Sequence, residues 1–76
     1  MYNIEECSTK LASSLRELRK HAGYTQKEVA SVLGITYQSY QAYERKVCYP
    51  SLPVLILLAE FYDVSIDSLI GRDEYL

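Results

Sequence analysis

The 76-residue sequence has few of the side chains that build metal sites and hydrolytic active sites. It contains one histidine and two cysteines, Cys7 and Cys48, which have no CxxC spacing. Zinc sites need clustered Cys and His ligands, so no metal site is expected. The sequence also lacks a glycine-rich phosphate loop, a Ser/His/Asp set and paired carboxylates at a plausible cleft. We therefore expect no enzymatic activity and no cofactor, and we interpret both cysteines as free thiols, with a redox switch at Cys48 as the alternative.

Long apolar runs are absent as well. The longest, residues 54–59, is far shorter than the ~20 residues that span a bilayer, and residues 1–6 are acidic, unlike the start of a signal peptide. We expect a cytoplasmic protein with no membrane partner. With 49% hydrophobic and 24% charged residues, the composition predicts one small globular domain over residues 1–76.

Positive charge is scarce overall but concentrated in one stretch. The net charge of −2 argues against nucleic-acid binding by bulk electrostatics. Residues 15–46, however, carry six basic and three acidic side chains, a net of +3, whereas the other segments carry two basic and seven acidic ones, a net of −5. This concentration of positive charge in the motif is what a DNA-facing surface needs.

Residues 25–44 organise the chain, because they predict two short helices joined by a tight turn. Thr25 is a candidate N-cap, and Glu28 completes a capping box. Gly34 is placed to end the first helix in a left-handed conformation, and Thr36 caps the second helix almost at once. This is a helix-turn-helix pattern, whose second helix is shaped to enter the major groove of DNA.

The rest of the chain predicts three further helices, at residues 9–22, 52–62 and 65–70, the last ended by Gly71. Residues 1–8 and 72–76 are expected to be peripheral. The expected fold is all-α, a compact five-helix bundle around one core.

Several short motifs at fixed spacing make the sequence resemble the phage repressor/Cro-like (xenobiotic-response-element, XRE) helix-turn-helix family. They are Thr25-Gln26, Leu33-Gly34-Ile35-Thr36, Tyr43-Glu44-Arg45 and Pro50-Ser51-Leu52. The resemblance covers about residues 12–71. It implies the lambda-repressor-like fold and binding of double-stranded DNA.

The resemblance also implies which residues meet DNA. Tyr37, Gln38 and Ala42 fall on base-reading positions, and Gln41 shares their helix surface; a glutamine amide can pair with adenine, and an alanine can touch a thymine methyl. The residues expected at the DNA backbone are Gln26, Lys27, Thr36, Arg45 and Lys46. The alternative for Gln26 is ordinary helix-start chemistry, and for the lysines and the recognition-helix residues it is a solvated surface. The loop after the second motif helix has fewer basic residues than relatives often carry, which implies weaker binding.

Four inward-facing side chains are expected to hold the motif in place. Arg19 and Glu44 match an ion pair that bridges the first helix to the end of the recognition helix, and Tyr40 and Tyr43 are expected in the core.

The helix predicted at residues 52–62 is apolar nearly all round. Its core side is expected to carry Leu52, Leu55, Leu58, Ala59 and Tyr62. Val54, Leu57 and Phe61 form a second stripe, which must also be covered. A homodimer interface is the favoured cover, and the alternative is the N-terminal segment (Tyr2, Ile4) or the tail (Tyr75, Leu76).

Together these expectations predict a sequence-specific transcriptional regulator, preferably a repressor, that binds a palindromic operator as a dimer. The alternative is a protein-interaction module of the same fold, antirepressor- or antitoxin-like, whose second apolar stripe binds a protein partner.

Overall fold

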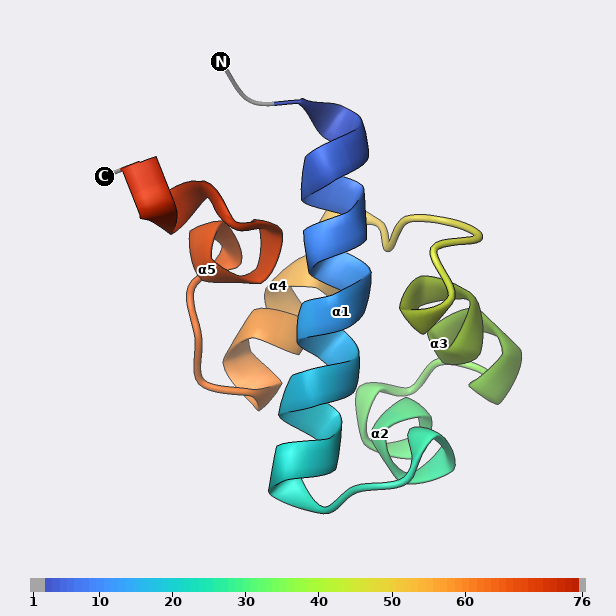
Figure 1. Cartoon of the computed structure of the whole chain (residues 1–76). Helices are drawn as coiled ribbons and strands as arrows, with labels where there is room; N and C mark the ends of the chain where they lie inside the picture. The colour runs from blue at the N-terminus through green and yellow to red at the C-terminus, as the bar shows by residue number, and fades with distance from the viewer. Residues whose placement is uncertain (1–2, 76) are drawn as a thin grey trace.

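The computed structural model describes residues 3–75, and the side chains of residues 3–73. In this range the chain forms six helical elements and no strand: α1 (Ile4–Ala22), α2 (Gln26–Leu33), α3 (Tyr37–Glu44), α4 (Leu52–Phe61), α5 (Ile66–Ile70) and the 3-10 helix η1 (Arg72–Tyr75). Figure 1 shows α1 running through the middle of the molecule, with α2 and α3 on one side, α5 on the other and α4 behind. The predicted all-α bundle is confirmed. No helix in the described range is long and apolar enough to cross a membrane.

Each of the five α-helices begins at a polar side chain that accepts a hydrogen bond from a backbone amide of the first turn. These caps matter because the first amides of a helix have no partner inside it. The capping box at Thr25 is complete, since Glu28 N donates to Thr25 Oγ1 at 3.1 Å and Thr25 N donates to Glu28 Oε1 at 2.8 Å. The capping residues are Asn3, Thr25, Thr36, Ser51 and Ser65.

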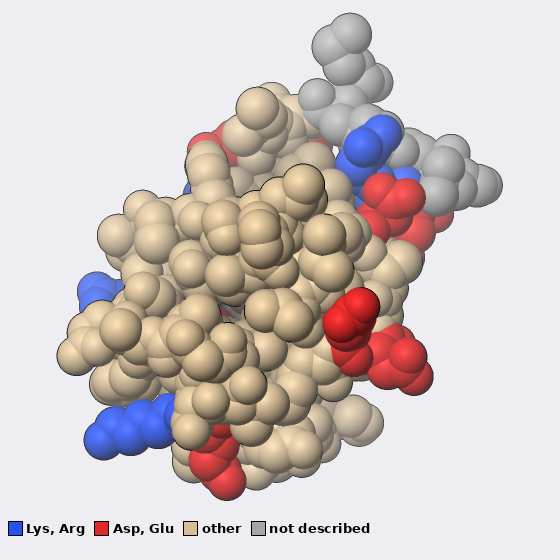
Figure 2. All heavy atoms as spheres, turned by 180° about the vertical axis from the view of Figure 1, so that it is seen from behind, with Lys and Arg blue, Asp and Glu red and all other residues tan. Residues whose placement is uncertain are grey.

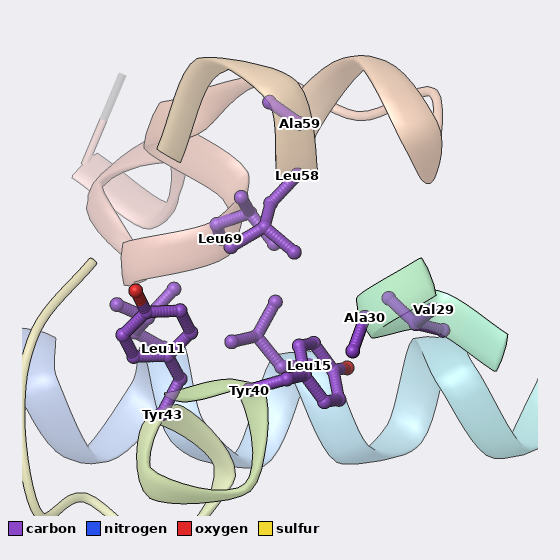
Figure 3. Packing of buried hydrophobic residues seen from close by; sticks show 9 residues of the cluster. All are labelled: Leu11, Leu15, Val29, Ala30, Tyr40, Tyr43, Leu58, Ala59 and Leu69. Atoms are coloured by element: carbon purple, nitrogen blue, oxygen red, sulfur yellow. The ribbon is translucent and has the colours of Figure 1, made fainter. Parts of the chain in front are cut away.

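One core joins all five α-helices (Figure 3). Its central side chains, Leu15, Tyr40 and Leu58, are fully inaccessible to solvent and come from α1, α3 and α4. Tyr43 is also buried, so both tyrosines predicted to face inward do so. The buried cluster consists of Leu11, Leu15, Val29, Ala30, Tyr40, Tyr43, Leu58, Ala59 and Leu69.

The predicted N-terminal boundary of α1 was wrong, because the helix begins at Ile4 rather than residue 9. Its first turn is held by Asn3, whose Oδ1 accepts from the amides of Glu5 at 2.7 Å and Glu6 at 3.3 Å. No apolar periodicity covers these residues, so the sequence gives no helical signal there. At the other end, residues 72–75 form the short helix η1, which the sequence analysis did not predict.

The predicted division of α4 into two stripes was wrong at Leu52, which is 66% exposed instead of buried in the core. Leu52, Ile56 and Leu57 lie on the outward face of α4, because Leu55, Leu58 and Ala59 turn toward the other helices. Val54 and Phe61 are partly buried and pack against the core. A helix that is apolar nearly all round gives no sequence signal for which side faces inward.

The proposed internal cover of α4 is not found among the described residues. Ile4 is 76% exposed, and Leu57 of the second stripe remains 42% exposed. The other residues named for that cover, Tyr2, Leu76 and the side chain of Tyr75, lie outside the described part of the structure.

The N-cap of α1 gives a first testable prediction. Asn3→Ala should lower the free energy of unfolding by about 1 kcal/mol, because two first-turn amides lose their acceptor. Urea unfolding followed by circular dichroism measures this. Asn3→Asp is the control, because a carboxylate accepts the same bonds and should retain stability; equal loss in both variants would contradict the assigned cap.

Candidate nucleic-acid interface

The turn between α2 and α3 is three residues long and has hydrogen bonds to both helices. Gly34 adopts a φ of 70°, the left-handed region that glycine enters at low cost. This lets Ile35 N donate to Ala30 O at 3.0 Å, closing α2. Thr36 Oγ1 then accepts from Ser39 N at 3.0 Å and opens α3. Local hydrogen bonds therefore fix where α2 ends and where α3 begins.

The surface of α3 carries the side chains that the sequence assigns to base contact. Gln38 is exposed, and Tyr37, Gln41 and Ala42 are partly exposed. Gln41 Nε2 donates to Tyr37 Oη at 3.4 Å, one helical turn away. Because Tyr40 and Tyr43 occupy the opposite, buried side, α3 presents a polar face anchored by an aromatic one.

Glu44, at the end of α3, is a buried carboxylate with partners on two other helices. Its side chain is 1% exposed. Arg19 Nε on α1 donates to Glu44 Oε2 at 2.7 Å, and Arg19 Nη2 donates to Oε1 at 3.1 Å. Gln26 Nε2, at the start of α2, donates to the same Oε1 at 3.0 Å. One carboxylate thus joins α1, α2 and α3.

These partners keep Glu44 ionised. Burial alone would raise the pKa of Glu44, but hydrogen bonds from Arg19, Tyr40 and Gln26 outweigh it, so the pKa lies below the ordinary 4.5. The hydrogen bond to Glu44 likewise raises the pKa of Arg19. The pair therefore stays charged at neutral pH, and its charge is neutralised inside the molecule.

A hollow of about 340 Å³ lies where α2 begins and α3 faces it. Lys27 Nζ lies 5.4 Å from the centre of the Tyr37 ring, a cation–π distance. Backbone amides at a helix N-terminus together with a lysine favour an anion. The lining residues are Arg19, Tyr24, Thr25, Gln26, Lys27 and Tyr37.

The remaining basic residues of the motif have different environments. Arg45 ends α3 and is exposed. Lys46 is bonded to Glu5 and Thr9 on α1, and Arg16 donates to the backbone oxygen of Glu44. The sequence interpretation missed Arg16 and Glu5 as partners. Arg16 lies three residues before Arg19, so the two share a helix face, and this spacing could have identified Arg16. Glu5 could not be identified, because the predicted α1 began only at residue 9.

Comparison with known proteins agrees with this geometry. The family model described as Helix-turn-helix matches residues 15–69, from the middle of α1 to α5. The chain belongs to the Cro/C1-type helix-turn-helix family. The predicted lambda-repressor-like fold and family are thereby confirmed.

Curated relatives within this helix-turn-helix family include bacterial and phage-encoded regulators. The HTH-type transcriptional regulator ImmR of Bacillus subtilis is 44% identical over 64 residues, which are 84% of this chain and 50% of that protein. The cryptic phage CTXphi transcriptional repressor RstR of Vibrio cholerae is 36% identical over 63 residues, 83% of this chain and 57% of that protein. The chain therefore spans about half the length of the curated relatives it matches.

The buried carboxylate gives a prediction for stability and its pH dependence. Glu44→Gln keeps the side-chain shape and should lower the free energy of unfolding at neutral pH by about 1.5–3 kcal/mol, because hydrogen bonds to a charged group are weakened. The pKa of Glu44 is lowered from 4.5, so its stabilisation is present above that pH and lost as the pH falls through the folded-state pKa. In urea unfolding, the difference between wild type and Glu44→Gln should therefore shrink at acidic pH.

The matched control is Glu17→Gln, which neutralises an exposed carboxylate on the same helix as Arg19. It should leave both the stability at neutral pH and the shape of the pH profile nearly unchanged. If Glu44→Gln behaved like this control, the carboxylate would not be the joint between α1, α2 and α3.

Proposed function

We propose that this chain binds double-stranded DNA through α3 and acts as a sequence-specific transcriptional regulator, a repressor by preference, working as a homodimer on a palindromic operator. The observation that carries this proposal is the construction of α3. The helix is anchored from behind by Tyr40, Tyr43 and Glu44 while it presents Gln38 to solvent. Membership of the helix-turn-helix family supports the same function.

The proposed contacts divide into bases and backbone. Gln38 reads a base edge, with Tyr37, Gln41 and Ala42 beside it, because a glutamine amide can both donate to and accept from adenine. Gln26, Lys27 and Thr36 meet phosphates near the N-terminal ends of α2 and α3. Arg45 meets them after the C-terminal end of α3, and Lys46 can meet them there once its ammonium leaves Glu5 and Thr9. Gln26 braces α3 through Glu44, so it helps to hold the reading helix as well as contacting DNA.

The proposed dimer interface is the outward face of α4. Leu52 is 66% exposed, and Ile56 and Leu57 are each 42% exposed. In Figure 2, which views the molecule from the side of α4, charged side chains lie mainly near the edges of a broad uncharged surface. Of the three residues proposed from sequence, Leu57 stays in this interface, whereas Val54 and Phe61 support it from the core side. An apolar surface of this kind favours association with a second copy.

The alternative, an interaction module that binds a protein instead of DNA, draws on the same α4 face and on the low sequence pI of about 5.2. The two functions differ at α3. A module without DNA binding would not depend on Gln38, so the next experiment separates them.

Selection of binding sites from random duplex DNA tests the function directly. Wild-type protein should enrich a palindrome whose half-sites lie about one helical turn, ~34–36 Å, apart. Gln38→Ala should lose preference at one position of each half-site, at about 1–3 kcal/mol of discrimination.

Ser31→Ala, an exposed change on α2, is the matched control and should retain the wild-type consensus. Failure of the wild-type protein to enrich any sequence would contradict the proposal and favour a protein partner at α4.

The dimer interface gives a separate prediction. Leu57→Glu should shift the chain toward monomer in sedimentation equilibrium, because it places a charge within an apolar contact. Val47→Glu makes the same type of change at a 70% exposed loop position and should leave the oligomeric state unchanged. A wild-type chain that is monomeric across the measured concentrations would refute this interface.

A further inference from the structure

One lysine ties the loop after α3 to the beginning of α1. Lys46 Nζ donates to a carboxylate oxygen of Glu5 and, at 2.9 Å, to Thr9 Oγ1. Glu5 and Thr9 are one helical turn apart, and Thr9 Oγ1 itself donates to Glu5 O at 2.9 Å. Two side chains of α1 therefore hold the ammonium group, although Thr9 and Glu5 lie 37 and 41 positions before Lys46 in sequence.

The backbone at Lys46 is a second indication that its side chain matters. Its φ is 62°, in the left-handed region where glycine is the residue of lowest cost. The turn alone therefore gives no reason for a lysine here. The ion pair with Glu5 on α1 does give a reason for a lysine, because the Lys46 side chain is only 32% exposed and its charge is already paired.

The position of Lys46 links this pair to DNA contact. Lys46 directly follows Arg45, the residue that ends α3, so it lies at the edge of the proposed DNA-binding face. An ammonium paired with a carboxylate is neutralised locally and displaces few counterions from a phosphate. The same ammonium, once released from Glu5, would contribute a full phosphate contact.

We propose that Glu5 competes with a DNA phosphate for the ammonium of Lys46, and that Glu5 thereby limits the affinity of the chain for duplex DNA. The inference rests on the proposed DNA binding, but not on sequence specificity. Glu5 acts as an internal substitute for phosphate, because both present an anionic oxygen to the same lysine. The expected effect on affinity is modest, since an exposed ion pair of this type is weak and screened by salt.

The decisive variant is Glu5→Gln, which removes the competing charge and keeps the size of the side chain. Binding to a duplex of random sequence is measured over a range of salt concentrations. Affinity should rise about two- to fivefold per protomer. The slope of log K against log salt should steepen by about 0.9 for each lysine that gains a phosphate. Far-UV circular dichroism checks that the first turn of α1 remains helical.

Glu6→Gln is the matched control, because it removes the same charge from the neighbouring exposed residue. It should raise affinity less and leave the slope unchanged. Equal effects of Glu5→Gln and Glu6→Gln would mean that net charge alone is responsible, and would overturn the proposal.

A double-mutant cycle locates the effect at Lys46. Lys46→Gln should leave the salt slope nearly unchanged in the wild-type background, where the ammonium is engaged by Glu5, and reduce it by about 0.9 in the Glu5→Gln background. A full reduction in the wild-type background would show that Lys46 already contacts phosphate, and would overturn the competition.

The use of random duplexes keeps the two proposals separable. A wild-type chain that binds these duplexes but enriches no sequence would contradict sequence-specific regulation while the slopes still decide the role of Glu5. A chain that binds no duplex at any salt concentration would overturn both proposals.

Discussion

The structure depends on the buried carboxylate of Glu44 more than on any other single group. Most of its hydrogen-bonding capacity is used by Arg19 of α1 and Gln26 of α2, so three helices share one acceptor. Burying a charge is costly unless it is paired and hydrogen-bonded, and this one is both. An alternative packing of α3 would leave the charge without these partners, so the arrangement contributes specificity of docking in addition to stability.

Tyrosines extend this polar joint into the core. Tyr40 is fully buried, and its hydroxyl lies 2.9 Å from the hydroxyl of Tyr62, the residue that caps α4. Burial, with hydrogen bonds to Glu44 and Tyr62, raises the pKa of Tyr40, so the phenol remains neutral. The ring fills space in the core as a large apolar side chain would, while the hydroxyl finds a partner. The core therefore holds α3 by both shape and hydrogen bonding.

Local chemistry made most of the fold predictable from sequence. Helix starts are marked by Thr25 with Glu28 and by Thr36, and a helix end is marked by Gly34. Each of these residues can be recognised from sequence, because its hydrogen-bond partners lie only a few residues away. Two features depended on non-local contacts and were missed. Glu5 acquires its role only when Lys46, far away in sequence, is folded beside it. Leu52 looks like a core residue in an apolar helix, and only the packing of α4 against the other helices decides that it faces outward.

The two sides of α4 connect the proposed dimer interface to the proposed reading helix. Its outward face carries Ile56 and Leu57, whereas its C-terminal end reaches α3 through the Tyr62–Tyr40 hydrogen bond. A dimer that recognises two half-sites must hold two copies of α3 at a fixed separation, and a flexible connection would blur that spacing. A short path through packed and hydrogen-bonded side chains meets this requirement without a dedicated linker. In so small a chain, the helix that would join two copies is thus also one that holds the DNA-facing helix in place.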